Sequence, residues 1–502
     1  MNKNKNKENQ SSYRSHRTPR ERGLKEDNRE KGMSGKFNKK YNSPKQDPFW
    51  YAEDSRAIEN MGNFPFLEVV GSKIGNSSDV VPGIMVARYK PAIGGRASST
   101  DTSTDSYLTR AAHAYYQYVT QGFTGGVDFE APDLLMSAIA GASTLAFFEV
   151  GRRAFGLINY YLQQNSYYAK DIVESLGFNY DDLVANIANF RSEFNVRVNQ
   201  VNTTIAIPKG FRIYDRWKFI NSMIFTDIED MTYASLYAYL PEAIALYKPV
   251  NAKTGTSLKW YGFTTPMTCE QYFSVLDAAI SALIDDDVRS MFGAIRRVYA
   301  DSDLIKVEGL DSGFLQPIVR HDIVAMQFHN MLFPNAGSKS VAILPSTLVG
   351  DSGDPTVGYT TMMYQDASGN ILSQYGLTSP GVKWGEEENS QMLLDMYGHL
   401  VKPENILDAT ANQQVASTSS FTYREYMAPS DTTAYYVVCR SELITGLKLV
   451  SRDVTDGSGT TVWEVNQSTS VFSNTPSELC ILSHISSHPY ILLVDSNDVI
   501  AS

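Results

Sequence analysis

Residues 183–201, LVANIANFRSEFNVRVNQV, carry the clearest structural signal in the chain. Their large apolar side chains recur at steps of four, three, four, four and three residues, which places them on one face of an α-helix. Asp181 and Asp182 stand just before this stretch, where carboxylates interact favourably with the positive end of a helix dipole. We therefore predict an amphipathic helix here, and its buried side holds Leu183, Ile187, Phe190, Phe194, Val198 and Val201.

Helical periodicity dominates a wider range around this stretch, from Tyr107 to about Tyr299. Its longest uncharged stretch, Leu134–Phe148, has fifteen residues. About 20 apolar residues are needed to span a bilayer, so we predict a buried helix and not a membrane span. Pro132 suits the first turn of this helix, where a missing N–H costs nothing. Gly177 is placed to end the helix that precedes the quoted stretch.

After about Phe333 the character of the sequence changes. Gly, Ser, Thr and Pro become more frequent, and short β-branched runs alternate with turns. Two hairpins are predicted, one around residues 366–370 (DASGN) and one around residues 456–459 (DGSG). Residues 80–95, ahead of the helical region, form a predicted extended segment between two Pro-containing turns. The sequence therefore predicts a mainly α part followed by a β-rich (α+β) C-terminal part, in which one helical pattern covers residues 391–401.

Charge is divided unevenly between the first 45 residues and the rest of the chain. Residues 1–45 carry fourteen Lys and Arg but five Asp and Glu, a net charge of +9. The other 457 residues carry 30 basic and 50 acidic side chains, a net charge of −20. Leu24, Met33 and Phe37 are the main apolar residues of the N-terminal segment, too few to offset the entropy cost of folding. We predict that residues 1–47 are a disordered basic arm.

A basic arm on an acidic body indicates that the arm neutralises a polyanion. Phosphates fit this role, because Lys and Arg release condensed counterions without needing a fixed geometry. Tyr13, Phe37 and Tyr41 are too sparse for a base-stacking platform, so we expect binding that ignores nucleotide sequence. A solvated tail or a localisation signal is the alternative. The predicted RNA-binding residues are the Lys and Arg of the arm: Lys3, Lys5, Lys7, Arg14, Arg17, Arg20, Arg22, Lys25, Arg29, Lys31, Lys36, Lys39, Lys40 and Lys45.

The sequence contains no recognisable active site. AAH at residues 111–113 and GDSG at residues 350–353 resemble the general-base and nucleophile segments of trypsin-like proteases. The second match fails at Asp354, where that family has a further Gly. The first match fails because His113 lies in a helical pattern, whereas the protease fold is all-β. We predict that His113 is an ordinary helix residue, that Ser352 lies in a turn, and that no residue is catalytic.

Metal and cofactor sites are equally unsupported. Asp285, Asp286 and Asp287 are consecutive on a helical pattern and point in different directions, so we expect solvated helix-end carboxylates. His484 and His488 precede a proline and lack a zinc-binding context. The sequence has neither a GxxxxGK[ST] phosphate loop nor a GxGxxG turn. We predict no metal, no cofactor and no small-molecule substrate.

These observations together suit a protein that packages nucleic acid inside a shell. Such a chain needs a polyanion-binding arm, contact surfaces and no chemistry, and this one has 30 Tyr and 23 Phe for contacts. Cys269, Cys439 and Cys480 are widely spaced and form no CxxC pair, which fits a reducing compartment.

One run of residues carries a resemblance to a known family. It comprises Arg152-Arg153, Phe155-Gly156, Asn159, Tyr160-Tyr161, Asn165, Tyr167-Tyr168, Leu176-Gly177, Asp181-Asp182-Leu183, Asn186 and Phe190-Arg191, with DPFWY at 47–51 and PGI at 82–84 upstream. These residues, densest at 150–230, resemble the central helical region and the N-terminal pattern of picobirnavirus capsid proteins. Because they are packing residues, we expect Arg152, Arg153 and Tyr168 to pack helices or contact subunits and not to bind RNA.

The resemblance implies a non-enveloped icosahedral capsid, built from dimers around segmented double-stranded RNA. It implies a mainly helical shell domain and a projecting domain with strands and helices, which we place at residues 48–330 and 331–502, after the arm at residues 1–47. Some members lose an N-terminal propeptide by self-cleavage, and no catalytic residue of that process maps onto this chain. The expected partners are further copies of the chain, viral RNA and, during infection, a host membrane or receptor. The protein would be assembled in the host cytoplasm and reside in the virion.

Three alternatives stay open at this point. One is the capsid protein of a related double-stranded RNA virus. Another is a cellular RNA-binding protein with a basic tail, against which the lack of an RNA-recognition motif in the sequence counts. The third is a trypsin-like hydrolase, which rests on the incomplete match at Ser352.

Overall fold

The computed structural model describes residues that all belong to the second of the chain's two units, Pro65–Ser502. They are residues 83–93, 107–164, 169–227, 234–249, 256–321, 324, 328, 360–366, 369–373, 413–415, 421–423, 436–438, 441–452, 460–466, 493–495 and 500–501. The arm at residues 1–47, with all fourteen predicted RNA-binding residues, lies outside them. So do Ser352, His484, His488 and the helical pattern at residues 391–401.

Helices predominate up to Arg320 and strands after it, which confirms the predicted fold class. The elements are β1 (Ile84–Pro91), α3 (Tyr107–Thr120), α4 (Ala131–Gln164), α5 (Ala169–Ser175), α6 (Tyr180–Ala185), α7 (Ile187–Thr204), α8 (Arg212–Ser222), β2 (Ile224–Thr226), β3 (Leu236–Pro241), β4 (Ala243–Pro249), β5 (Thr256–Gly262), α9 (Cys269–Ala282), α10 (Asp286–Val298), η3 (Asp301–Asp303), β6 (Ile318–Arg320), β7 (Thr360–Gln365), β8 (Ile371–Ser373), β9 (Gln413–Val415), β10 (Phe421–Tyr423), β11 (Tyr436–Val438), β12 (Glu442–Arg452), β13 (Thr460–Asn466), β14 (Leu493–Asp495) and β15 (Ile500–Ala501).

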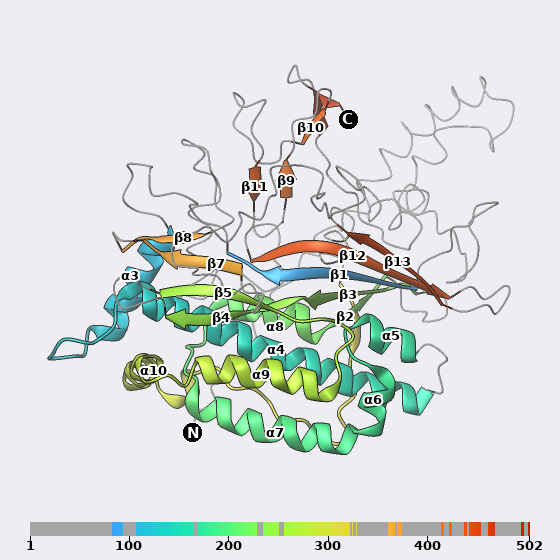
Figure 1. The fold of residues 1–502 in the computed structure, drawn as a ribbon, viewed down its shortest axis with the longest axis horizontal. Helices are drawn as coiled ribbons and strands as arrows, with labels where there is room; N and C mark the ends of the chain where they lie inside the picture. Colours follow the sequence, from blue (N-terminus) through green and yellow to red (C-terminus); the bar gives the residue numbers. More distant parts are fainter. Residues whose placement is uncertain are drawn as a thin grey trace, which may run out of the picture. The chain divides into compact units, whose positions relative to one another are not determined.

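Six strands form one mixed sheet in the order β13-β12-β1-β3-β2-β6. β1 lies inside this sheet, antiparallel to β12 and parallel to β3, and Figure 1 shows the three strands side by side. The β12–β13 hairpin predicted around residues 456–459 is confirmed. The sheet therefore takes strands from both sides of the domain boundary expected near residue 330, and that boundary stays a prediction.

A second sheet has the order β4-β5-β7-β8. Its β7–β8 hairpin confirms the turn predicted at residues 366–370. Gly369 has φ +82°, a conformation that favours glycine, and Asp366 Oδ1 accepts a hydrogen bond from the Asn370 N–H across the same turn (2.8 Å). The Ile371 N–H donates to Thr109 Oγ1 of α3 (3.0 Å), which ties this sheet to the helices.

Helical periodicity does not continue unbroken from Tyr107 to Tyr299, and the prediction is wrong between Ile224 and Gly262. Strands β2, β3, β4 and β5 occupy that interval. All six residues of β3, LYAYLP, are buried. A strand buried on both faces shows a continuous apolar run in place of alternation, and its periodicity cannot be told from that of a buried helix.

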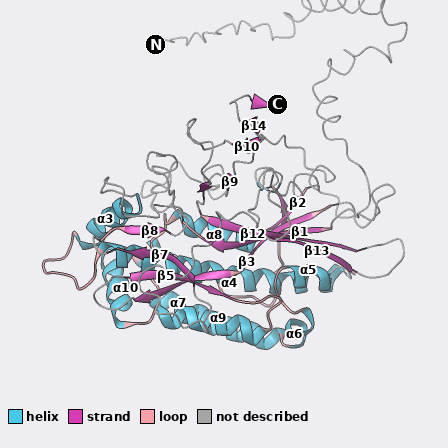
Figure 2. Cartoon of the chain, turned by 45° about the horizontal axis from the view of Figure 1, so that its top comes forward, coloured by secondary structure: helices cyan, strands magenta, loops and turns pink. Residues whose placement is uncertain are grey.

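The predicted buried helix around Leu134–Phe148 is confirmed, but it is much longer than its uncharged stretch. α4 has 34 residues, begins at Ala131 with Pro132 next, and continues through three charged residues to Gln164. It is the one described helix long and apolar enough to cross a membrane, and its most apolar window is 100% buried inside the protein, as in a core helix. In Figure 1, α4 runs beneath β4 and β5, with α9 and α7 on its other side, and Figure 2 shows α6, α7 and α9 gathered on one side of the strands.

The helix predicted from residues 183–201 is present as two helices, α6 and α7, separated at Asn186. The Asn186 side chain donates to the backbone oxygen and to Oδ1 of Asp182 (both 3.0 Å), so the backbone oxygen of Asp182 accepts from both the side chain and the N–H of Asn186 (3.0 Å). The apolar face is buried as predicted except for Ile187, which is partly buried. Gly177, with φ +92°, follows α5 as predicted.

Candidate functional site

A buried ion pair joins the helices to the C-terminal strands. Arg216 of α8 is 0% exposed, and its Nη2 donates to Oε1 of Glu442 at the start of β12 (2.6 Å). The neighbouring Trp217 donates from Nε1 to the backbone oxygen of Ser441 (2.8 Å). Two consecutive residues of α8 therefore bind Ser441 and Glu442, the two residues at which the chain enters β12. Removing one partner of such a pair leaves a desolvated charge, which is strongly destabilising.

A second buried arginine, Arg153 of α4, has backbone oxygens as partners. Its Nη1 donates to Ile220 and Met223 (3.3 Å each), at the carboxyl end of α8, and its Nη2 donates to Tyr239 in β3 (2.9 Å). A cation is favoured at a helix carboxyl end by the dipole and by the unpaired carbonyls there. Burial lowers the pKa of Arg153 to about 10, so the guanidinium stays charged near neutral pH. Arg153 thus locks α4, α8 and β3 together.

Tyr89 of β1 completes this buried polar network. Its hydroxyl donates to Asn221 Oδ1 (2.7 Å), and Asn221 Nδ2 donates to the backbone oxygen of Ala146 in α4 (3.2 Å). Burial raises the pKa of Tyr89 well above its usual value, so the hydroxyl remains a donor. β1, α8 and α4 come from distant parts of the sequence and meet at this point.

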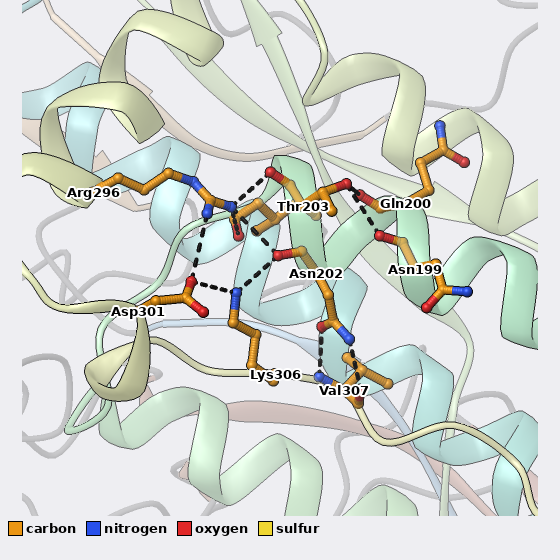
Figure 3. Close-up of polar contacts among 9 residues, drawn as sticks. Asn199, Gln200, Asn202, Thr203, Arg296, Asp301, Lys306 and Val307 are labelled. Atoms are coloured by element: carbon orange, nitrogen blue, oxygen red, sulfur yellow. Dashed lines mark hydrogen bonds and ion pairs between the residues drawn. The ribbon is translucent and has the colours of Figure 1, made fainter.

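A second group of polar contacts holds residues 304–316, which we call the strap, against α7. Asn202 Nδ2 donates to the backbone oxygen of Val307 (2.9 Å) and Asn202 Oδ1 accepts from the Val307 N–H (2.8 Å), as Figure 3 shows. Asn195, seven residues or about two turns earlier on α7, makes the same pair of bonds with Leu310 (3.1 and 2.7 Å). Each asparagine side chain binds backbone groups of the strap. These bonds therefore position the strap without depending on the identity of its side chains.

The strap continues across α4. Asn159 Nδ2 donates to the backbone oxygens of Ser312 and Phe314 (3.1 and 3.0 Å), and the Gln316 N–H donates to the backbone oxygen of Gly156 (3.2 Å). A Cβ at Gly156 would lie 2.6 Å from a ring carbon of Phe314, so only glycine allows this approach. The strap thus links the end of α10 to the sheet through contacts with two helices.

The carboxyl end of α7 is capped by two cations, also drawn in Figure 3. Arg296 Nη2 donates to the backbone oxygens of Thr203 (2.8 Å) and Ile205 (3.1 Å). Lys306 Nζ donates to the backbone oxygen of Asn202 (2.9 Å) and to Asp301 Oδ1 (2.8 Å). The hydrogen bond from Lys306 lowers the pKa of the Asp301 carboxyl. Both cations bind backbone oxygens at the end of α7, and Lys306 also pairs with Asp301, so these two side chains do not form a free basic patch.

The residues weighed for chemistry lie apart from one another. His113 lies in α3, as predicted, and its side chain is exposed, whereas Ser352 lies outside the described residues. Asp285 caps the start of α10, and Asp286 and Asp287 stand in its first turn, which confirms the interpretation as helix-end carboxylates. Within the described part of the chain, no group of three or more His, Cys, Asp or Glu side chains could hold a metal ion.

Arg152 and Arg153 were predicted to pack helices or contact subunits. Arg153 is a helix-packing residue, as its buried bonds show. Arg152 packs its guanidinium over the Phe314 ring of the strap (4.6 Å to the centroid) and pairs with Glu308 (2.6 Å), so it too is used within the subunit. Tyr168 lies outside the described residues.

The aromatic residues of the helical region serve mainly its own core. The Tyr272 ring lies 5.1 Å from those of Phe147 and Phe178 and 5.6 Å from that of Phe190, centre to centre. Among the described residues, the exposed large apolar side chains are Val196 (61%) and Leu315 (40%). The polar clusters of the described residues thus hold the helices, the strands and the strap together.

Comparisons with known proteins identify the family of this chain. A family model described as "Picobirnavirus, Capsid protein" matches residues 57–332. The "Capsid protein precursor" of human picobirnavirus is 23% identical over 309 residues, which are 57% of this chain and 54% of that protein, so the match spans about half of that relative's length. The fold is similar to the X-ray crystallographic structure of the picobirnavirus capsid, with a TM-score of 0.55 and 19% identity over 87% of this chain and 86% of that chain. The family match covers more than half of the sequence, so this chain belongs to the picobirnavirus capsid protein family, whose role is structural.

Proposed function

We propose that this chain assembles as dimers into a closed icosahedral shell that encloses double-stranded RNA. The observation that carries the proposal is its membership of the capsid protein family, together with a described core in which polar residues fix shape. Assembly takes place in the host cytoplasm, and the shell meets a host membrane or receptor during infection.

The division of charge supports separate roles for the arm and the body. The arm carries +9 and the remaining 457 residues −20, so the arm attracts phosphates while the body repels stray RNA. We assign residues 1–47 to the RNA-contacting arm, residues 48–330 to the shell and residues 331–502 to the projecting and C-terminal region. Inside a shell the arms of many subunits add their charge, so weak contacts from each suffice.

The dimer contact is expected to bury on the order of 2,000 Å² or more of largely apolar surface. The described surface offers Val196 and Leu315 as its exposed large apolar side chains. Among the described residues, these two side chains are therefore candidates for the apolar part of the dimer contact.

Electron microscopy and light scattering of the purified recombinant chain test assembly directly. We expect closed shells, and dimers when the shells are dissociated at low protein concentration. Monomers alone, over a range of salt and protein concentration, would contradict the proposal.

A structural role also predicts that the trypsin-like match has no function. Ser352→Ala and His113→Ala should leave any proteolytic maturation unchanged, because His113 lies exposed on a helix and the GDSG match is incomplete. Loss of a specific cleavage in Ser352→Ala, with shells still forming, would show that a serine nucleophile operates.

A further inference from the structure

Glu149 is a carboxylate buried in the middle of α4, at 2% exposure. Its Oε1 accepts no hydrogen bond from any residue that the structure describes. The nearest cations are Arg152 Nη1, 3.9 Å from Oε2, and Lys218 Nζ of α8, 3.9 Å from Oε1. These separations are too long for hydrogen bonds. Glu149 is therefore desolvated and near two positive charges, but Oε1 has no described donor.

Arg152 stands between Glu149 and the strap. Its Nη2 forms an ion pair with Glu308 Oε2 at 2.6 Å, and its guanidinium lies over the Phe314 ring. Glu308 and Phe314 both belong to the strap. Arg152 is thus a direct electrostatic link from a buried helix carboxylate to a segment held otherwise by asparagine–backbone bonds.

The other titratable groups around Glu149 do not change charge with it. Tyr214 of α8 and Tyr272 of α9 lie in its electrostatic neighbourhood, and burial raises the pKa of both well above the usual value for tyrosine. The Tyr272 hydroxyl donates to the backbone oxygen of Phe147 (3.3 Å). Lys218 is 38% exposed and can turn its ammonium toward water when Glu149 is neutral.

We propose that Glu149, Arg152 and Glu308 form a proton-operated latch on the strap. With Glu149 ionised, Arg152 is drawn between two carboxylates, and the strap is held less firmly. With Glu149 protonated, Arg152 binds Glu308 alone and holds the strap against α4. The proton comes from solvent, and no bond other than O–H changes.

The sign of the pH dependence follows from the two carboxyls. Burial raises the pKa of Glu149 above its ordinary value of 4.5, so its contribution to stability is fully present below that value and is lost as pH rises through the folded-state pKa. The hydrogen bond from Arg152 lowers the pKa of Glu308, so that contribution is lost only as pH falls through a value below 4.5. The latch is therefore tightest between the lowered pKa of Glu308 and the raised pKa of Glu149, and it loosens as pH rises through the raised pKa of Glu149.

Hydrogen exchange of the full-length protein tests the latch at the strap amides of Ile305, Val307 and Leu310. Protection factors, which correct for the intrinsic pH dependence of exchange, are measured at about pH 5 and about pH 8. We expect the wild-type strap to be several-fold better protected at the lower pH. Glu149→Gln should be well protected at both, because its neutral amide mimics the protonated acid.

Two further variants complete the test. Glu308→Gln should leave the strap poorly protected at both pH values, since Arg152 loses its partner there. Glu174→Gln, a carboxylate of α5 paired with Lys170 (3.8 Å), should behave as wild type. The latch is refuted if wild-type strap protection is the same at both pH values, or if Glu149→Gln keeps the wild-type difference.

Discussion

The first 45 residues and the residues packed around α4 use charge in opposite ways. The arm carries fourteen Lys and Arg side chains and very few apolar residues. The RNA binding proposed for it does not require these cations to have fixed positions. Around α4 the cations are few and each has a fixed place: Arg153 holds the end of α8, Arg216 holds Glu442, and Arg152 reaches the strap. In the described body each of these charges has a defined partner, whereas the role we propose for the arm depends only on its positive charge.

This difference predicts how each region responds to substitution. Replacing one buried charge leaves a desolvated partner that no neighbour can satisfy, so a single change in the body is costly. Under the proposed RNA-binding role, replacing one arm charge would remove one of many equivalent phosphate contacts, so a single change there is expected to be nearly silent. The substitutions below run from the largest expected effect to the smallest.

The largest expected effect comes from removing the carboxylate of Glu442. Glu442→Ala leaves the Arg216 guanidinium buried without its carboxylate, and we expect a loss of about 3–5 kcal/mol in the free energy of unfolding, measured in denaturant. Glu193→Ala, which breaks an exposed pair with Arg197 (2.7 Å), is the matched control and should cost less than about 1 kcal/mol. Equal losses in the free energy of unfolding would show that burial does not determine how much each ion pair contributes to stability.

The second-largest loss of stability is expected where a side chain packs closely against α4. A Cβ at Gly151 would overlap the Tyr272 hydroxyl, which is wedged in the aromatic cluster, so Gly151→Ala should destabilise by about 1–3 kcal/mol. Gly293 lies in α10 with nothing within 4 Å of its added Cβ. Gly293→Ala should therefore stabilise by roughly 0.5–1 kcal/mol. Thermal unfolding of both variants measures the contrast, and a neutral Gly151→Ala would mean that α4 is not closely packed there.

The strap gives a smaller and more local effect. Asn202→Ala leaves the N–H and C=O of Val307 without their partner, and we expect a loss of about 2 kcal/mol. Asn199, exposed on the same helix, supplies the control, since Asn199→Ala removes a side chain in solvent and should change stability by less than about 0.5 kcal/mol. Hydrogen exchange should place the Asn202→Ala effect in the strap, and a loss spread evenly over the protein would argue against a separately held segment.

Single arm substitutions should have the smallest effect. Lys3→Gln should leave the unfolding free energy of the body unchanged and lower the salt dependence of RNA binding by at most roughly 0.9 log units per tenfold salt. Filter binding over a series of salt concentrations measures this. A large loss of affinity from Lys3→Gln alone would mean that the arm presents a specific site.

Local sequence patterns predicted several of the helices and both hairpins, although they failed between Ile224 and Gly262. The Asp366–Asn370 turn and the helix start at Pro132 depend on residues close together in the sequence, and both were confirmed. The apolar face from Leu183 to Val201 was also found, but on two helices. The break at Asn186 was missed, because an asparagine that bonds back to Asp182 looks like any polar residue of a helix.

The long-range contacts could not be predicted from local patterns. β3 is buried on both faces and gave a helix-like apolar run, and the Arg216–Glu442 pair joins residues 226 positions apart. The asparagines that bind the strap had one usable signal, their seven-residue spacing on the polar side of α7, but their partners lie about a hundred residues later. Arg153 was expected to pack between helices. The backbone oxygens that it binds could not be predicted, because they depend on where α8 ends.

The central claim is that arm charge packages RNA while the body builds the shell, and the RNA content of purified shells tests it most directly. We predict that deleting residues 1–45 leaves closed shells that have lost most of their RNA, and that scrambling the arm at constant composition preserves RNA. Replacing Lys3, Lys5, Lys7, Arg14, Arg17, Arg20 and Arg22 with Gln should impair packaging. Shells that keep a normal RNA content without residues 1–45, or a scrambled arm that fails as badly as the Gln variant, would contradict the account.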